Sequence, residues 1–98
     1  MNNEIKEKYL PIGTVVKLIG GEFALMITGY CVKARDEQDD KYFDYCGCPY
    51  PAGIVDSNVN HVFNHDKIEK ILYMGYESEL HTEYSNFIKE TLNNNSQE

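Results

Sequence analysis

The sequence contains no tryptophan, only three cysteines and three prolines, and few basic residues. Nine lysines and arginines stand against sixteen aspartates and glutamates, which gives a formal net charge of -7 at pH 7. This shortage of positive charge disfavours nucleic acid and anionic membrane surfaces as partners, since both are recognised through a basic footprint. Three cysteines are an odd number without regular spacing, which argues against a disulfide framework.

The sequence also lacks any apolar run near the roughly 18 residues that a membrane-spanning helix needs. Its first nine residues, MNNEIKEKY, have no apolar core of the kind that a secretory signal requires. We therefore expect a cytoplasmic protein. A chain of 98 residues suffices for one core, and we predict a polar leader over 1–8, one globular domain over 9–93 and a disordered tail over 94–98.

The first three quarters of the chain carry the pattern of short strands. Strands are predicted at 14–19, 23–34, 42–48, 61–63 and 70–76, with a further short one at 54–55. Gly20 and Gly21 predict a tight hairpin, Gly29 a bend, and Pro49–Gly53 a turn. Eight tyrosines suit a half-buried sheet whose hydroxyls reach solvent. We predict a mainly β, α+β fold, with a small bent antiparallel sheet or partial barrel of five to six strands over 9–76.

From Ser78 the apolar spacing changes to that of an amphipathic helix, predicted over 77–93 with Ser78 as its N-cap. The apolar positions are Leu80, Tyr84, Phe87, Ile88 and Leu92. Docking on the sheet is the expected role of Leu80, Tyr84 and Phe87, whereas Ile88 and Leu92 lie further out. The candidate partner-binding residues are Ile88, Leu92 and Tyr84.

One stretch has a sequence pattern similar to that of a metal site, because Cys46 and Cys48 are followed after twelve residues by His61 and His65. Structural zinc sites usually place two to four residues between their cysteines, not one. On a strand the two cysteines point to the same face, as core residues do. The histidines lie in a segment too rich in Asn and β-formers for one helix. We expect an edge or surface position for His61 and an Asn64-capped turn over 65–69, and we predict no metal and no cofactor.

Catalytic patterns are weak throughout the sequence. Nothing beside Cys31, Cys46 or Cys48 resembles a helix N-terminus or an elbow that would activate a thiol. No phosphate-binding loop is present, because no Lys-Ser pair follows Gly20 and Gly21. We therefore expect a protein without enzymatic activity that binds another protein through a sheet edge or the C-terminal helix. A metal- or thiol-dependent enzyme is the weaker alternative.

Four segments together resemble a known family: LPIGTVVKL, ALMITGY, FDYCGCPYPAG and FNHDKIEKILYMGYES. They are similar to a small bacterial domain-of-unknown-function family encoded beside type VII secretion genes in Firmicutes. Its members occur with LXG-type toxins, small helical partners and immunity proteins, and the positions of Cys46 and Cys48 are commonly Val, Ser or Leu. The resemblance implies a cytoplasmic, chaperone-like accessory protein that binds an exported toxin or its small helical adaptor. The alternative that it implies is an immunity protein.

Overall fold

The computed structural model describes residues 9–33 and 42–96, and for residues 32, 33 and 92–96 it describes the backbone alone. The predicted leader and the acidic segment 34–41 lie outside the described residues. The elements in chain order are β1 (Val15–Leu18), β2 (Ala24–Lys33), β3 (Tyr42–Tyr50), β4 (His61–Phe63), the 3₁₀ turn η1 (His65–Lys67), β5 (Ile68–Tyr73) and α1 (Glu79–Ser96).

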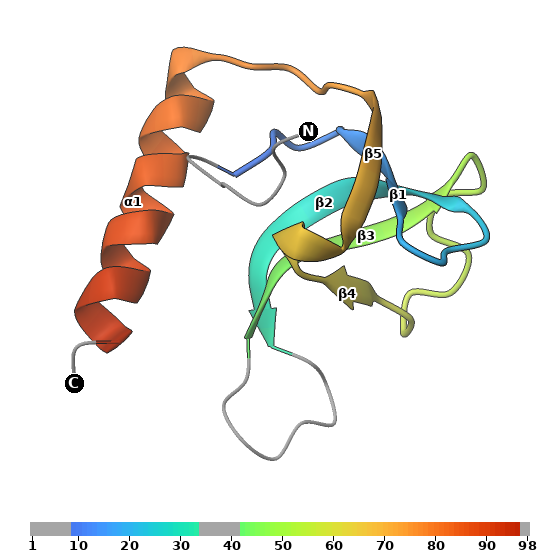
Figure 1. The fold of residues 1–98 in the computed structure, drawn as a ribbon, viewed down its shortest axis with the longest axis horizontal. Helices are drawn as coiled ribbons and strands as arrows, with labels where there is room; N and C mark the ends of the chain where they lie inside the picture. The colour runs from blue at the N-terminus through green and yellow to red at the C-terminus, as the bar shows by residue number, and fades with distance from the viewer. Residues whose placement is uncertain (1–8, 34–41, 97–98) are drawn as a thin grey trace.

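The five strands form one open antiparallel sheet in the order β4-β3-β2-β1-β5, followed by the single C-terminal helix (Figure 1). The predicted fold class is thereby confirmed. The predicted short strand at Ile54 and Val55 is wrong, because these residues lie exposed in the loop that leads to β4. Strand β3 also runs on through Pro49 to Tyr50, and β5 begins two residues before the predicted position.

Strand β2 bends where the sequence predicted it, at Gly29. The pairing of β2 with β3 shifts register between Ile27 and Gly29. A Cβ atom on Gly29 would lie 2.9 Å from Cys46 Sγ, and one on Gly47 would lie 2.5 Å from the Met26 carbonyl oxygen. Only glycine therefore permits this close approach of the two strands, which curve together in Figure 1.

The turn η1 joins strands at opposite edges of the sheet. In a flat sheet of five strands these edges would lie about 19 Å apart, at roughly 4.8 Å per strand. Only four residues separate Phe63 in β4 from Ile68 in β5, and a 3₁₀ turn advances about 2 Å per residue. The connection is therefore too short for a flat sheet, and the sheet must curl.

The core fills the concave side of the curled sheet and includes one residue of α1. Its buried members are Tyr9, Val16, Leu25, Ile27, Tyr45, Phe63, Ile68 and Ile88. Strand alternation explains the choice, since Val16 and Leu25 face inward while their neighbours Val15 and Met26 face the other side. Tyr9 and Tyr45 are fully buried, so the expectation that tyrosine hydroxyls reach solvent is wrong for these two.

Helix α1 begins as the sequence predicted. The Ser78 hydroxyl oxygen accepts a hydrogen bond from the His81 N–H at 3.2 Å, as an N-cap does. The helix continues to Ser96, three residues beyond the predicted end at 93. Within the described part of the chain, no helix combines the length and the apolar character that crossing a membrane would need.

Candidate functional site

Helix α1 meets the sheet through a two-residue segment, Tyr9–Leu10, which we call the strap. On the helix side, the Tyr9 N–H donates to Ser85 Oγ at 2.8 Å. The Tyr9 carbonyl oxygen lies 2.7 Å from His81 Nε2, so this ring nitrogen carries the hydrogen and donates it. Two polar side chains of the helix therefore hold the backbone of one strap residue.

The sheet holds the strap in a matching way. The Leu10 N–H donates to the Tyr45 hydroxyl oxygen at 3.1 Å, and the Tyr30 hydroxyl donates to the Leu10 carbonyl at 2.7 Å. The Tyr9 ring packs edge-on against both sheet tyrosines, with centroid distances of 5.5 Å to Tyr30 and 5.8 Å to Tyr45. All four backbone polar groups of the strap thus have side-chain partners, which satisfies the requirement of a buried backbone.

Burial keeps these phenols protonated. It raises the pKa of Tyr30 to about 12. Burial also raises the pKa of Tyr9 and of Tyr45 well above the ordinary value of 10. The Tyr30 hydroxyl therefore remains a hydrogen-bond donor to the strap at any pH near neutrality.

His65, one of the metal candidates, belongs to the core network instead. The Tyr45 hydroxyl, which accepts from the Leu10 N–H, also forms a hydrogen bond with His65 Nδ1, at 2.8 Å. The His65 N–H donates to Asp44 Oδ2 at 2.8 Å, and the Asp44 N–H donates to Asn64 Oδ1 at 3.0 Å. The predicted turn after Asn64 is confirmed as η1, but the Asn64 side chain bonds strand β3 and caps no N–H of the turn.

The structure does not gather the four metal candidates. Cys46 and Cys48 share one face of β3, as predicted, and alternate with Tyr45, which faces the core. His61 lies on the edge strand β4, with its ring 5.8 Å from that of Phe23. Within residues 9–33 and 42–96, no group of three or more His, Cys, Asp or Glu is placed to hold a metal ion.

The orientation of α1 differs from the prediction. Ile88 is only 7% exposed and belongs to the core, whereas Leu80 is 78% and Phe87 60% exposed. The expectation that Leu80 and Phe87 dock on the sheet while Ile88 lies further out is therefore wrong. Tyr84 is 52% exposed and stays a candidate for partner binding. The Leu92 side chain lies outside the described residues.

The reason for this orientation lies in the strap. The side of α1 that faces the sheet carries His81, Ser85 and Ile88, and two of these three bond the Tyr9 backbone. We call these three residues the buried stripe, and Leu80, Tyr84 and Phe87 the exposed stripe. His81 is half-buried in this contact.

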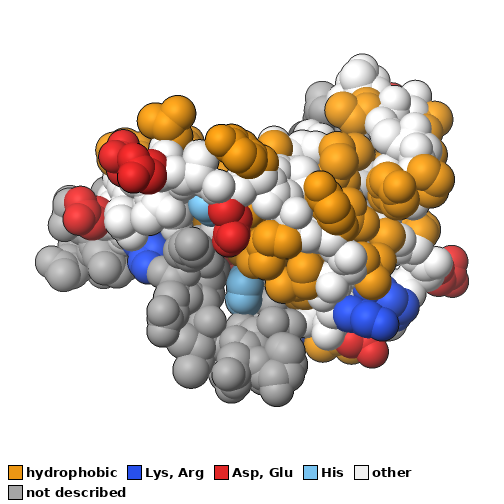
Figure 2. All heavy atoms as spheres, turned by 90° about the horizontal axis from the view of Figure 1, so that it is seen from above, with side chains coloured by type: hydrophobic (Ala, Val, Ile, Leu, Met, Phe, Trp, Pro, Cys, Tyr) orange, Lys and Arg blue, Asp and Glu red, His pale blue; other side chains and the backbone are white. Residues whose placement is uncertain are grey.

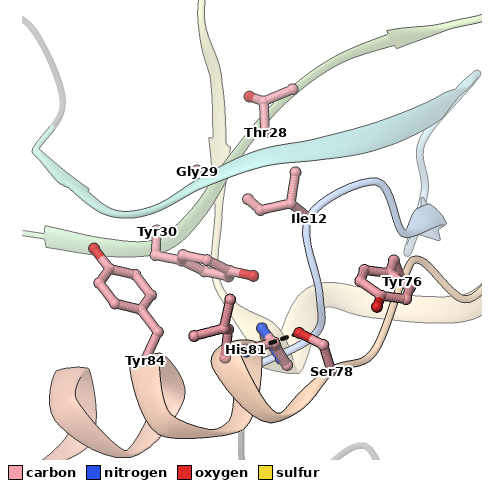
Figure 3. Close-up of a pocket in the computed structure, with 9 residues that line it drawn as sticks. Ile12, Thr28, Gly29, Tyr30, Tyr76, Ser78, His81 and Tyr84 are labelled. Atoms are coloured by element: carbon pink, nitrogen blue, oxygen red, sulfur yellow. Dashed lines mark hydrogen bonds between the residues drawn. The ribbon is translucent and has the colours of Figure 1, made fainter.

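An open groove of about 650 Å³ lies between the start of α1 and strand β2. We call it the α1 groove. Its lining residues are Ile12, Thr28, Gly29, Tyr30, Tyr76, Ser78, Leu80, His81 and Tyr84 (Figure 3). The Tyr30 ring forms its wall, 6.0 Å from the Tyr84 ring and 6.2 Å from the His81 ring between centroids. Tyr76, at its end, is 82% exposed.

Three polar side chains of the α1 groove have partners inside the molecule. His81 Nε2 bonds the Tyr9 carbonyl, the Tyr30 hydroxyl bonds the Leu10 carbonyl, and Ser78 Oγ caps the helix. What the groove offers to a ligand is therefore the apolar and aromatic surface of Ile12, Leu80 and the tyrosine rings. Such a surface is suited to apolar side chains.

Sequence reasoning missed Ile12 and Tyr76 as parts of a site. Each is an apolar residue beside a glycine: Gly13 lies in a turn before β1, and Gly75 lies in the irregular segment between β5 and α1. The two segments meet closely, because a Cβ atom on Gly75 would clash with the Ile12 carbonyl oxygen. The signal available in the sequence was the presence of large apolar residues in segments that otherwise have a turn composition.

A second hollow, of about 450 Å³, lies on the convex face of the sheet and is lined by Gly13, Val15, Met26, Tyr50, Leu72 and Tyr73. The molecule seen from above has many apolar side chains on its surface (Figure 2). The α1 groove differs from this hollow in having a helix as one wall.

Comparison with family models matches residues 9–84 to a domain of unknown function (DUF4176). This range begins at the strap and ends at Tyr84, so it contains every lining residue of the α1 groove. Comparisons with curated proteins and with solved structures give no match. The resemblance that the sequence suggested is confirmed as far as a family of unknown function.

Proposed function

We propose that this chain, which belongs to the DUF4176 family of domains of unknown function, is a non-catalytic protein-binding module. The α1 groove would hold an apolar segment of its partner. The observation that carries this proposal is the exposed stripe of α1, where Leu80, Tyr84 and Phe87 stay half or more exposed beside a preformed groove. Contiguous apolar surface of this kind is typical of an interaction site.

The energetics favour a partner at this surface. Full burial of a leucine side chain is worth about 1.5–3 kcal/mol relative to leaving it exposed. Leu80 gains almost none of this in the free protein, because it is 78% exposed. The Tyr30 wall is fixed by its bond to the strap, so a partner would meet a surface that needs little ordering on binding.

The same contacts support binding over catalysis. A general acid or base needs a proton-transfer atom that can reach the substrate. In the α1 groove, His81 Nε2 and the Tyr30 hydroxyl, two atoms able to transfer a proton, both bond the strap. These two side chains therefore have a structural task that accounts for their presence.

The partner class in this proposal follows the resemblance to the family encoded beside type VII secretion genes. The partner would be an exported LXG-type toxin or its small helical adaptor, held in the cytoplasm before export. The module would act as a chaperone-like accessory protein that covers an apolar segment of the toxin. Its negative charge would steer a basic partner toward it.

Copurification of proteins encoded by the neighbouring genes tests the proposal. The full-length protein is expressed from its own gene cluster, together with a Leu80→Gln/Tyr84→Gln variant. Glutamine keeps the helix propensity close to that of leucine, so the groove changes while the helix remains. The matched control is Ile19→Gln, which replaces another exposed apolar residue, in the turn after β1.

We expect the wild type and Ile19→Gln to copurify similar amounts of the same neighbour-encoded protein. The groove variant should copurify at least about tenfold less of it, because central interface residues contribute most of the binding energy. Equal recovery by all three would contradict the proposal. Coexpression with the toxin separates the two roles. An accessory protein raises the amount or export of the toxin, whereas an immunity protein restores growth without either effect.

A further inference from the structure

We infer that the occupant of the α1 groove is an amphipathic helix whose apolar stripe is flanked by lysine or arginine. This inference rests on the proposed function and narrows its partner class. The spacing and the charge of the side chains on α1 both indicate this occupant.

The spacing of the exposed stripe is the first observation. Leu80, Tyr84 and Phe87 lie four and three residues apart, which places them along one side of the helix. They cover about 10 Å, or two helical turns, at 1.5 Å per residue. A row of this kind packs against the corresponding row of a second helix. The partner would therefore present apolar residues at i, i+4 and i+7.

The groove supplies the second wall for such a helix. The Tyr84 ring lies 6.0 Å from Phe87 on one side and 6.0 Å from Tyr30 of β2 on the other, between centroids. Figure 3 shows the Tyr84 side chain rising from α1 beside that of Tyr30 on β2. The apolar surface thus continues from the helix onto the sheet, so a docked helix would be enclosed on two sides.

Charge gives the third observation. Each residue turns the helix by about 100°, and this places Glu79, Glu83 and Glu90 together in an acidic stripe. The acidic stripe borders the exposed stripe on the side away from the buried stripe. All three glutamates are exposed, and Lys89 is the one lysine or arginine among residues 79–91, whose side chains are described. Figure 2 shows acidic side chains beside apolar ones at the left, where α1 lies.

The acidic stripe also selects between occupants. A second copy of this chain would bring its own Glu79, Glu83 and Glu90 against the same residues, at a formal net charge of -7 for each copy. Like charges placed together oppose association. A partner helix with lysine or arginine beside its apolar row would instead pair with the acidic stripe.

Binding of short fluorescent peptides to the full-length protein, followed by fluorescence anisotropy, tests the inference. Three peptides share one composition of leucine and alanine. The first has leucines at i, i+4 and i+7 with flanking lysines, and the second has the same leucines with flanking glutamates. The third keeps the lysines but scatters the leucines around the helix. Each peptide is measured at low and high salt against four proteins: the wild type, Tyr84→Gln, Glu79→Gln/Glu83→Gln and the control Asp66→Asn.

We expect the first peptide to bind at least about tenfold more tightly than either of the others. Tyr84→Gln should weaken it about tenfold, and Glu79→Gln/Glu83→Gln about threefold, with a smaller dependence on salt. Asp66→Asn, an exposed acidic residue on η1, should leave binding unchanged. Equal binding of the first and third peptides, equal binding of the first and second, or no binding of any would each overturn the inference.

The peptide-binding and copurification experiments can fail independently of each other. If the copurified partner depends on Leu80 and Tyr84 while the lysine-flanked peptide does not bind, the groove binds a segment of another kind. If the peptide binds but no copurified protein depends on the groove, the inference about peptide chemistry stands and the proposed function falls. Circular dichroism melting of every variant serves as the control for folding.

Discussion

Two stripes on helix α1, one residue apart in sequence, differ in an instructive way. The buried stripe is His81, Ser85 and Ile88, and the exposed stripe is Leu80, Tyr84 and Phe87. The two have the same spacing, yet the more polar stripe faces the sheet. Hydrophobicity alone predicts the opposite orientation. The orientation follows instead from the strap, whose buried backbone groups require hydrogen-bond partners.

The buried stripe stabilises the fold, whereas the exposed stripe is available to bind a partner. The buried stripe and the sheet tyrosines satisfy the strap and complete the core, so changing them should lower the free energy of unfolding. The exposed stripe contributes little to the fold, so changing it should alter binding alone. Four experiments test this division.

The largest effect is expected from alkaline pH. An unfolded tyrosine ionises near pH 10, whereas burial raises the pKa of Tyr30 in the folded protein to about 12. The folded state therefore keeps protons that the unfolded state loses, and stability that is fully present below pH 10 is lost as the pH rises toward 12. Tyr9 and Tyr45 shift in the same direction. We expect urea unfolding midpoints to fall steeply in this window, until the protein is unfolded.

The Tyr30→Phe variant should show a shallower fall, because it removes one of the groups that cause it. Tyr73→Phe, which changes an exposed tyrosine on β5, provides the control and should keep the steep fall. A midpoint that stays constant up to pH 12 would contradict the role of these phenols in the fold.

The next effect is expected from neighbouring residues of the two stripes. Ile88→Ala removes buried methyl groups from the core and should lower the free energy of unfolding by about 2–5 kcal/mol. Phe87→Ala removes a larger side chain that is 60% exposed, and should change it by no more than about 0.5 kcal/mol. Urea denaturation at neutral pH measures both. Equal losses for the two variants would place both residues in the core and end the distinction.

A smaller effect is expected from Ser85→Ala, which removes the acceptor of the buried Tyr9 N–H. The expected loss is about 1–3 kcal/mol, the cost of leaving a buried donor without its partner. The neighbouring Asn86→Ala, at an exposed helix position, serves as the control. Amide hydrogen exchange adds a local measurement, since Tyr9 should lose its protection in Ser85→Ala and keep it in Asn86→Ala. Stability unchanged by Ser85→Ala would remove the strap as the cause of the helix orientation.

The smallest effect on stability is expected from Leu80→Gln. Its side chain is 78% exposed, and glutamine matches leucine in helix propensity, so the free energy of unfolding should change by at most about 0.5 kcal/mol. Binding of a hydrophobic fluorescent dye should nevertheless fall, because the α1 groove loses apolar surface. A stability loss above about 1 kcal/mol, or unchanged dye binding, would show that Leu80 belongs to the fold.

The sequence predicted what depends on local pattern. The five paired strands, the bend at Gly29 and the cap at Ser78 all follow from residue type and spacing, and the structure contains each of them. The additional strand at Ile54 and Val55 failed, although both residues have high strand propensity. Propensity does not supply a neighbouring strand, and this pair has none in the sheet.

What depends on distant parts of the chain was not predictable from pattern. The orientation of α1 requires the knowledge that Ser85 and His81 bond Tyr9, a residue outside every predicted element. The buried position of His65 depends on its hydrogen bonds to Tyr45 and Asp44, which lie twenty and twenty-one positions earlier in the sequence. Of the three candidate partner-binding residues, Tyr84 is exposed at the α1 groove, while Ile88 is in the core.

The strap also fixes an order of events during synthesis of the chain. Tyr9 is made early, but its partners His81 and Ser85 follow 72 and 76 positions later. The sheet, complete at Tyr73, can therefore pair its strands while the Tyr9 backbone still lacks its helix partners. Bringing together segments so far apart in sequence is slow, because a long loop must close first. Until residue 81 has been made, the strap can bond its sheet partners Tyr30 and Tyr45 but neither of its helix partners.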